Sequence, residues 1–265
     1  MIGEDEKWWA VASDWRVREI YADIKAIPPL VVRADGRNFK RVLRDAGFSK
    51  PFDRRFAELM VKTVEMFFAE SGFNPKFAYL FSDEINLFFH EIPFNGRVEK
   101  IDSVISGFLS SALTIVSGFK VPISFDARVI PLCHDIIIRY FAERQAEAWR
   151  NHMNAYAFYT LLKDGLSESD AQARLKGMKS DKIHEFMFCR GVNLSKTPAW
   201  QRRGIVVAKV PYEKHGYNPL TGEKVVTKRF KIVQFWELPL FKTEEGRKFI
   251  EKLLRDDCRR FPSQM

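Results

Sequence analysis

Two short acidic sites lie at the edges of apolar runs in this chain. Asp35-Gly36 follows Pro-Leu-Val-Val-Arg-Ala, and Ser82-Asp83-Glu84 separates Phe-Ala-Tyr-Leu-Phe from Ile-Asn-Leu-Phe-Phe. Apolar runs of this length, bounded by turn residues, are typical of buried strands. Carboxylates at the ends of neighbouring strands can face one cleft and hold divalent cations together. The pattern therefore indicates a site for phosphoryl or nucleotidyl transfer.

Both sites also have an ordinary structural interpretation. Asp-Gly after a strand is commonly a turn, because Gly adopts positive φ and Asp bonds to its own backbone. Ser-Asp-Glu between two apolar runs can equally be a plain hairpin tip. Two features favour a site over two turns. Both tips carry an Asp, and the first is surrounded by basic residues, as metal-bound phosphates would require: Arg33, Arg37, Lys40 and Arg41.

The elements that would position these carboxylates follow from periodicity and capping residues. In chain order they are a helix over residues 13–26, a strand over 30–34, a helix from the cap Asp53 to about Glu70, a hairpin at Ser82-Asp83-Glu84, a helix over 98–117 and a strand over 122–132. The βαββαβ order predicts a ferredoxin-like α+β unit, whose first and third strands are central. Asp35 and Asp83 would then lie at the same end of adjacent strands.

The chain changes character beyond residue 132, so we predict two closely packed parts. Residues 1–132 form the catalytic unit with its N-terminal helix, and residues 133–265 form a helical and β extension. The extension is predicted to contain a long helix over 134–164, a short helix capped by Ser167, and strands over 205–210 and 230–236 joined by a loop that contains Gly and Pro.

Positive charge gathers in the extension. Between Arg190 and Lys231 there are 10 basic and 2 acidic residues, a net charge of +8 in a chain whose total is +9. Aromatic residues are interleaved with them, which suits a polyanion with unpaired bases, such as the end of an RNA. The alternative is a solvated β-edge whose lysines prevent aggregation. We therefore expect the extension to contact nucleic acid.

Composition narrows the class of protein further. A chain of 265 residues, 46% apolar and 29% charged, is typical of a soluble globular protein, and no apolar stretch reaches the roughly 18 residues that span a bilayer. The N-terminus lacks signal-peptide features, and three widely spaced cysteines argue against disulfides and a Cys-rich zinc site, so we expect a reducing cytoplasm and no membrane partner. No phosphate-binding loop, dinucleotide fingerprint, nucleophile elbow or His-Glu-x-x-His pair occurs.

Several segments resemble motifs of the tRNA-histidine guanylyltransferase family and its 3′–5′ polymerase-like relatives. Arg33-Ala-Asp-Gly-Arg-Asn-Phe-Lys-Arg resembles the first metal-binding motif, and Phe81-Ser-Asp-Glu-Ile-Asn-Leu-Phe-Phe resembles the second. Phe48-Ser-Lys-Pro-Phe-Asp-Arg-Arg resembles the family's Lys-Pro-Asn-Asp segment, with Phe52 in place of Asn. Later matches are Phe125-Asp-Ala-Arg-Val, Glu143-Arg-Gln-Ala-Glu, Ala171-Gln-Ala-Arg-Leu-Lys-Gly and Gly191-Val-Asn-Leu followed by Trp200-Gln-Arg-Arg-Gly.

The resemblance implies a polymerase-palm-like unit that adds nucleotides to the 5′ end of tRNA. Two Mg²⁺ ions would be held by Asp35, the Gly36 carbonyl and Asp83, with Glu84 as a supporting catalytic residue. ATP or GTP would activate the 5′-phosphate, and the 3′-hydroxyl of an incoming nucleotide would then attack that end. The implied nucleotide-binding residues are Asp35, Gly36, Arg37, Asn38, Phe39, Lys40, Lys50, Asp53, Arg55, Ser82, Asp83, Arg97 and Lys100.

The later motifs and the basic segment supply the expected tRNA contacts, which are Arg128, Arg144, Gln145, Arg202, Arg203, Lys209, Lys228 and Arg229. One departure bears on the choice of tRNA. Enzymes of the family that read the histidine anticodon carry His-x-Asn-Asn after the Arg-Gln motif, whereas this chain has Trp149-Arg-Asn-His. The resemblance therefore favours the branch that repairs truncated tRNA 5′ ends by copying the opposing strand.

Three alternatives stay open at this point. They are a guanylyltransferase specific for histidine tRNA, a palm-fold enzyme that acts on nucleotides alone, such as a cyclase, and a catalytically silent RNA-binding protein. The family also suggests a homodimer or homotetramer, in which the basic segment of one subunit could hold tRNA for another.

Overall fold

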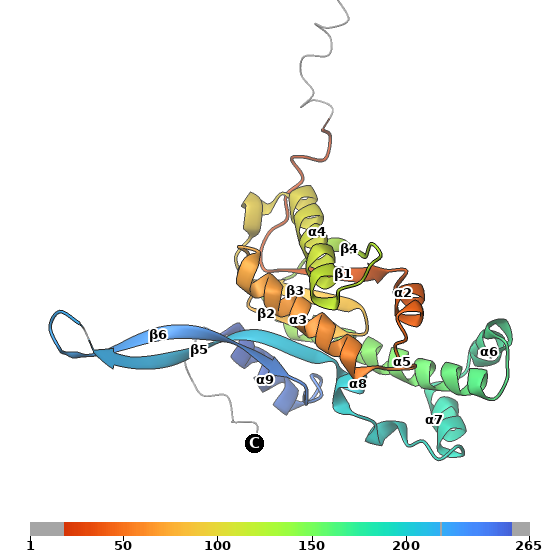
Figure 1. Ribbon diagram of the computed structural model, residues 1–265. Helices are drawn as coiled ribbons and strands as arrows, with labels where there is room; N and C mark the ends of the chain where they lie inside the picture. Colours follow the sequence, from red (N-terminus) through yellow and green to blue (C-terminus); the bar gives the residue numbers. More distant parts are fainter. Residues whose placement is uncertain (1–18, 218, 256–265) are drawn as a thin grey trace, which may run out of the picture.

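The computed structural model describes residues 19–217 and 219–255, and its centre is one six-stranded antiparallel sheet (Figure 1). The strands are β1 (Leu30–Arg37), β2 (Phe77–Phe81), β3 (Glu84–Phe89), β4 (Ser124–Pro131), β5 (Ile205–Tyr217) and β6 (Lys224–Phe235). Their order across the sheet is β4-β1-β3-β2-β5-β6. The two strands with acidic sites, β1 and β3, are therefore neighbours at the centre of the first four, as the sequence predicts.

Helices cover both faces of the sheet. They are α2 (Phe39–Asp45), α3 (Arg54–Glu70), α4 (Val98–Ser117), α5 (Ile137–Lys163), α6 (Glu168–Leu175), α7 (Ser180–Phe188), α8 (Ala199–Arg203) and α9 (Glu244–Leu254), with short 3₁₀ turns at Pro93–Gly96, His134–Ile136 and Leu194–Lys196. The predicted βαββαβ order is confirmed for the first four strands. The result is a mixed α/β fold with an antiparallel sheet.

Alternation along the strands divides the core into two layers. On β1, Val32 and Ala34 pack against α3 and α4, while Val31 faces α5. All these side chains are fully buried. Asp35 shares the face of Val31, because residues two and four apart in a strand point the same way. The first carboxylate of the sequence therefore faces the α5 side of the sheet.

Local capping explains why the helix boundaries could be predicted. The Asp53 side chain accepts a hydrogen bond from the Arg55 amide and begins α3, and the Ser167 hydroxyl accepts one from the Asp170 amide and begins α6. Helix α4 has the predicted bounds and ends at Gly118, which adopts φ +66°.

Three predicted elements differ from the structure. The N-terminal helix over 13–26 lies partly outside the described residues, and its described part forms a turn at 20–23, because Ala26 and Ile24 bond to Gly96 and Val98 instead. Strand β1 continues past residue 34, so Asp35 lies within it. Residues 211–217 and 224–229 continue β5 and β6 as a long two-stranded ribbon rather than a loop.

The ribbon is the part of β5 and β6 that leaves the body of the molecule (Figure 1). Its strands pair in register from Val206–Phe235 to Tyr217–Lys224, and most side chains beyond Val210 are exposed. The two strands of the ribbon hydrogen bond to each other, although neither face of the ribbon packs against the core.

Helix α4 alone, among the described residues, has the length and composition of a membrane-spanning helix, in contrast to the expectation that no stretch would. Its Ile101, Ile105, Leu109 and Leu113 are fully buried against the sheet and α3. In this structure α4 serves as a core helix.

Candidate active site at the β1–β3 edge

The structure brings the acidic residues of the two motifs together. Asp35 pairs with Glu84 in the β1–β3 register, and the Gly36 amide donates to the Asp83 carbonyl at 3.2 Å. Burial raises the pKa of Asp83, and the nearby charge of Asp35 raises it further, while Lys50 opposes the shift. The two carboxylates repel each other, so the arrangement favours a bound cation.

Oxygen atoms are the donors that the cleft offers. Among the described residues no three His, Cys, Asp or Glu side chains gather as a metal cluster. A cation at this edge would therefore take Asp35 and Asp83 together with backbone oxygen, and the Gly36 carbonyl is adjacent. Carboxylate and carbonyl oxygens are the ligands of Mg²⁺, which keeps several waters. The donor set fits the expected metal.

Glu84 lies behind this pair in a hydrogen-bonded network. Its side chain accepts from Asn86 Nδ2 at 2.8 Å and from Arg144 Nε at 2.9 Å, and Arg144 Nη2 donates to the second oxygen. Tyr140 donates to Asn86 Oδ1 at 2.8 Å. Burial raises the pKa of Glu84, and Arg144 opposes this shift. Glu84 thus supports the site through Arg144, which the sequence analysis assigned to tRNA.

A loop between α2 and α3 brings the ammonium group of Lys50 near Asp83. Burial lowers the pKa of Lys50, the Asp83 carboxylate opposes this, and Lys40 adds to it. Asp53 and Arg55 hold the loop, because Asp53 accepts from the Ser49 amide at 2.8 Å and pairs with Arg55 at 2.7 Å. Arg55 holds the pKa of Asp53 well below its usual range. Asp53 and Arg55 therefore orient Lys50 and its neighbours.

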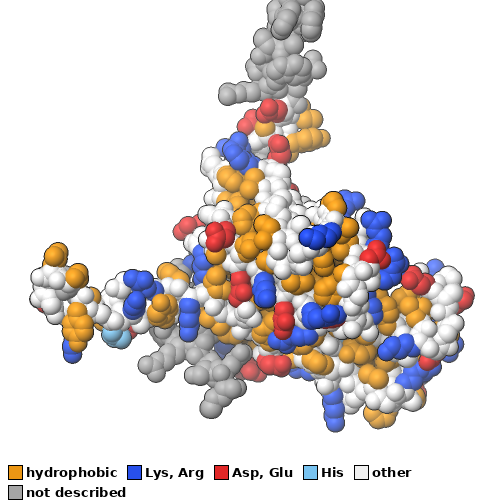
Figure 2. Space-filling model, in the orientation of Figure 1, with side chains coloured by type: hydrophobic (Ala, Val, Ile, Leu, Met, Phe, Trp, Pro, Cys, Tyr) orange, Lys and Arg blue, Asp and Glu red, His pale blue; other side chains and the backbone are white. Residues whose placement is uncertain are grey.

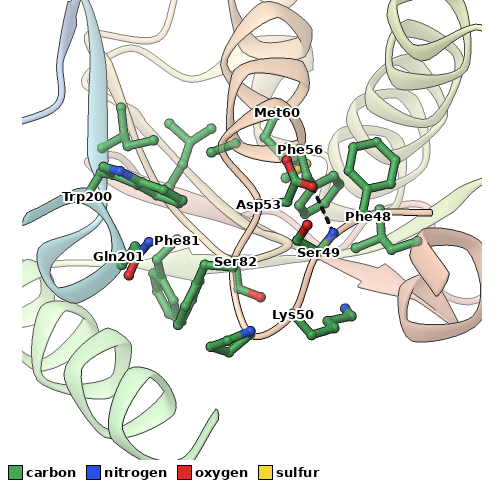
Figure 3. Close-up of a pocket in the computed structure, with 16 residues that line it drawn as sticks. Phe48, Ser49, Lys50, Asp53, Phe56, Met60, Phe81, Ser82, Trp200 and Gln201 are labelled. Atoms are coloured by element: carbon green, nitrogen blue, oxygen red, sulfur yellow. Dashed lines mark hydrogen bonds between the residues drawn. The ribbon is translucent and has the colours of Figure 1, made fainter. Parts of the chain in front are cut away.

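An apolar cavity adjoins Lys50 and the hairpin tip (Figure 3). Phe48, Phe56 and Met60 line one side of it and Trp200 and Gln201 the other, with Ser82 between them. Ser82 adopts φ 51°, which is rare for a residue other than Gly and is typical of functional turns. An apolar cavity that is lined in part by a lysine and adjoins the hairpin tip suits a nucleobase whose phosphates reach the cleft.

Phe52, which replaces the family's Asn, joins this loop to the extension. Its ring stacks on His152 at 5.6 Å and lies 5.8 Å from Tyr156 and 6.2 Å from Trp200, measured between ring centroids. Burial lowers the pKa of His152 to about 3, so its imidazole is neutral, and it contacts Thr197 Oγ1 through Nε2 at 2.9 Å. The cluster fixes the Lys50 loop against α5 and α8.

Phe52→Ala should lower the free energy of unfolding by about 2 kcal/mol, because a half-buried ring leaves a cavity among three aromatic neighbours. It should also raise KM for nucleotides, since the Lys50 loop loses its anchor. Urea unfolding measures the first effect and steady-state kinetics the second. Phe188→Ala is the matched control, because Phe188 is 67% exposed and should change stability by less than about 0.5 kcal/mol. Equal effects of the two changes would contradict the anchoring role.

Several predicted nucleotide-binding residues lie elsewhere. Arg97 and Lys100 are at the opposite end of the sheet, because α4 begins after β3 ends while the site is where β3 begins. This corrects the expectation that they lie near the triphosphate. Phe39 is 5% exposed and packs on Phe56 and Phe125, so its ring belongs to the core.

Other predicted residues keep accessible positions around the cleft. Lys40 pairs with Glu168 of α6 at 2.7 Å, and both side chains are more than half exposed. Arg37 and Asn38 are exposed where β1 passes into α2. Gly36 has room for no larger residue, since a Cβ there would come within 2.8 Å of the Phe39 ring.

The expected tRNA contacts divide between the interior and the surface. Gln145 is 4% exposed and bonds to Pro239 O, Arg203 O and the Phe241 amide, which corrects its assignment as a direct contact. Arg202 and Arg203 are half-buried, and each donates to a backbone carbonyl at 2.7 Å.

Arg128 lies on β4, and three further expected contacts lie on β5 and β6. Lys209 bonds to Asn74 at 3.1 Å near the body of the molecule, and Lys228 and Arg229 are exposed on the ribbon. Figure 2 shows basic side chains along the ribbon.

Sequence reasoning missed part of the site. Asn86 and Tyr140, which hold Glu84, were not singled out, and Asp126 was not assigned a role. Asp126 and Arg128 alternate on β4 as Arg33 and Asp35 do on β1, and the two pairs are in register. The alternation of Arg and Asp with a period of two on both strands was the sequence signal that could have identified Asp126 as part of the site.

Comparisons with known proteins agree with the motifs. A family model described as tRNAHis guanylyltransferase matches residues 14–133, and one described as Thg1 C terminal domain matches residues 135–239. A probable tRNA(His) guanylyltransferase of Bos taurus is 31% identical over 204 residues, which are 72% of this chain and 68% of the relative. The tRNA(His) guanylyltransferase of Schizosaccharomyces pombe is 25% identical over 238 residues, 85% of this chain and 91% of the relative.

Solved structures share the fold. A bacterial tRNA(His) guanylyltransferase-like protein in complex with GTP has a TM-score of 0.66 at 23% identity, and the match covers 92% of this chain and 99% of that one. The structure of a bacterial protein of this type in complex with ATP has a TM-score of 0.64 at 25% identity, over 90% of this chain and 96% of that one.

Proposed function

The chain belongs to the tRNA(His) guanylyltransferase family, and on that premise we propose that it extends truncated tRNA 5′ ends in the 3′–5′ direction by copying the opposing strand. Membership makes it a tRNA 5′-end nucleotidyltransferase. The observation that carries the proposal is the cleft in which Asp35, Asp83 and Lys50 meet beside an apolar cavity. We further propose that the first four strands with α3 and α4 act as a polymerase palm.

The proposed reaction has two steps. The 5′-phosphate of the tRNA attacks the α-phosphorus of ATP or GTP and releases pyrophosphate. The 3′-hydroxyl of the incoming nucleotide then attacks the activated 5′-phosphorus and releases the nucleoside monophosphate. Bacterial proteins of similar fold have been solved with GTP and with ATP, which supports both as substrates.

Asp35, Asp83 and the Gly36 carbonyl would hold Mg²⁺. The metal would polarise the phosphate and favour the attacking alkoxide. Lys50, desolvated beside Asp83, would contact the triphosphate, and its position is set by Asp53, Arg55 and Phe52. The apolar cavity would hold the base, and Ser82 would contribute its hydroxyl at the rim.

The choice of template-directed repair rests on Trp149. The family's anticodon-reading His is replaced here by an indole that stacks on His152, with ring centroids 5.2 Å apart and planes 16° apart. A Trp offers one N–H donor and cannot reproduce the paired donor and acceptor of an imidazole. The other candidate, a guanylyltransferase specific for histidine tRNA, is favoured by the names of the relatives.

Formation of the activated end tests the proposal. The protein is incubated with Mg²⁺, α-labelled ATP or GTP, and tRNA that lacks its first nucleotide and carries a 5′-monophosphate. We expect label on the tRNA that resists phosphatase and leaves as the nucleoside monophosphate when the next nucleotide is added. Tight tRNA binding without label or extension would contradict the proposal and support a silent RNA-binding protein. Turnover of nucleotides without RNA would support a cyclase-like enzyme.

The ribbon is proposed to contact the tRNA backbone. Replacing exposed Lys214, Lys224 and Arg229 together by Gln should reduce the slope of log affinity against log salt by about 2, because each phosphate contact contributes about 0.7–0.9. Stability should stay within about 0.5 kcal/mol per change, since none of the three side chains is in the core. Filter binding across a salt series measures the slope.

A control with the same change in charge separates specific contact from net charge. Lys163, Lys182 and Lys248 are exposed on helices, and their replacement by Gln removes the same three charges. We expect a smaller change of slope. An equal change in both triple variants would contradict a specific role for the ribbon.

We also propose that the protein assembles as a homodimer or homotetramer. Ile20, Tyr21, Ile24 and Ile27 are 50–75% exposed on one short segment, and such apolar surface commonly marks an interface. Light scattering coupled to size exclusion would show the assembly. Full activity from a preparation that contains monomer alone would contradict this proposal.

A further inference from the structure

Two guanidinium groups converge on Asp35 without hydrogen bonding to it. Arg33 Nε and Arg128 Nη2 both lie 3.5 Å from the same oxygen, Asp35 Oδ2. Hydrogen bonds between such groups are about 2.7–3.2 Å long, so neither contact is a good one. The buried Arg33 Nε has no partner among the described residues, although buried donors are nearly always satisfied.

The strand register places these groups side by side. Arg33 on β1 pairs with Arg128 on β4, and Asp35 pairs with Asp126 two residues further on. Like charges directly opposite each other in a sheet are destabilising. Arg128 is held by Asp126 at 2.8 Å, and Arg33 has the weaker contact with Asp35 alone. The sheet therefore keeps a repulsive pair of arginines at the edge of the cleft.

A phosphate would resolve this arrangement. The planar fork of each guanidinium matches phosphate oxygens, and an anion between two such forks removes their repulsion. The side chains of Arg33 and Arg128 are 21% and 51% exposed, so a ligand can reach both from the cleft.

The pair is separated from the proposed nucleotide site. The sheet order is β4-β1-β3-β2-β5, and the arginines are on β4 and β1, whereas β2 and β5 line the apolar cavity next to Lys50. Asp35 contacts both arginines, and Asp83, at the turn between β2 and β3, lies on the side of the cavity and Lys50. The proposed reaction joins two phosphate-bearing partners at these carboxylates, so it needs two phosphate sites on either side of them.

We infer that Arg33 and Arg128 form a receptor for the 5′-phosphate of the RNA end, distinct from the triphosphate contacts on the Lys50 side. The inference rests on the proposed function, since it assigns the second substrate of that reaction. Arg128 was expected to contact tRNA from its motif, and the structure narrows that contact to one phosphate and adds Arg33 as its partner.

Equilibrium binding without nucleoside triphosphate tests the receptor. The probes are two tRNAs that lack the first nucleotide and differ only in a 5′-phosphate or a 5′-hydroxyl, measured in Mg²⁺ by fluorescence anisotropy. Wild type should prefer the phosphate by roughly tenfold. Arg33→Gln and Arg128→Gln should each reduce the preference severalfold, and the double variant should abolish it. Arg128→Lys should keep part of it, because a lysine supplies charge without the fork.

Two further variants separate this site from its neighbours. Arg229→Gln, on the ribbon, should weaken both RNAs by the same factor and leave the preference unchanged. Lys50→Gln should weaken binding of a non-hydrolysable nucleotide analogue and leave the preference unchanged. Circular dichroism and unfolding curves check that each variant is folded. If Arg33→Gln does not fold, Arg128→Lys still tests the receptor.

The binding results distinguish failure of the proposed phosphate receptor from failure of the proposed function. If Arg33→Gln and Arg128→Gln weaken both RNAs equally, or leave the preference intact while wild type extends tRNA, the receptor is overturned and the proposed function stands. If they abolish binding of the nucleotide analogue and spare the RNA preference, the arginines belong to the triphosphate site. If wild type binds no RNA and extends none, the proposed function is overturned together with the receptor.

Discussion

Asp83→Asn is expected to lower the rate of nucleotide addition by about 10³-fold or more and to stabilise the metal-free protein by roughly 0.5–2 kcal/mol. The loss of activity follows because the proposed metal site would lose one of its two carboxylates. The gain in stability follows because Asp83 ionises in a buried position beside Asp35, and burial raises its pKa. Asn keeps the shape of the hairpin tip without the charge.

The pH dependence gives the sign of this effect. A carboxyl whose folded pKa lies above its unfolded value of 3.8 favours folding fully below that value and loses this contribution as pH rises through the folded pKa. The variant should therefore exceed wild type in stability at neutral pH, and the difference should vanish in acid. Denaturant unfolding in EDTA across pH measures it. Added Mg²⁺ should favour wild type, because the proposed site would bind Mg²⁺ in the folded wild-type protein.

Asp45→Asn is the matched control, since Asp45 is an exposed carboxylate that pairs only with its neighbour Arg44. It should change neither activity nor stability appreciably. A loss of stability in Asp83→Asn at neutral pH without metal would contradict the view that the cleft holds unneutralised charge.

Arg144→Met should lower the free energy of unfolding by about 3–5 kcal/mol, because it leaves the Glu84 carboxylate buried without its cation. Glu84 is 7% exposed and takes two hydrogen bonds from this guanidinium. The double variant Glu84→Gln/Arg144→Met should recover much of the loss, since Gln is neutral and can still accept from Asn86. Urea unfolding of both single variants and the double completes the cycle.

Arg139→Met is the control for this cycle. Arg139 lies on the same helix and pairs with Glu143 at 2.8 Å, but both side chains are exposed. Its loss should matter by less than about 1 kcal/mol. Additive effects of Glu84→Gln and Arg144→Met would contradict the buried network.

Local signals explain which parts of the fold could be predicted. Asp53, Ser167 and the apolar periodicity of α4 act within a few residues of themselves, and the structure places α3, α6 and α4 where these signals indicate. The ribbon lacks such a signal. Its residues are exposed on both faces, so no alternation of apolar and polar side chains marks the strands beyond Val210.

The positions of some site residues could likewise be predicted from the sequence, and those of others could not. Asp35, Asp83 and Glu84 could be brought together because the βαββαβ order puts the end of the first strand beside the hairpin tip. Arg97 and Lys100 were misplaced by motif spacing, although the same topology begins α4 at the far end of the sheet. The pairing of Arg33 with Arg128 depends on strand register. The register joins residues 95 positions apart, and neither local sequence predicts it.

The most direct measurement of the central claim is the identity of the added nucleotide when the template changes. Four tRNAs that lack the first nucleotide and differ only in the opposing base are offered with Mg²⁺ and all four nucleoside triphosphates, and the extended 5′ ends are sequenced. Wild type should add the complement of each opposing base, and Asp83→Asn should add nothing. Addition of guanosine whatever the opposing base, or no addition despite tight binding, would contradict template-directed 3′–5′ repair.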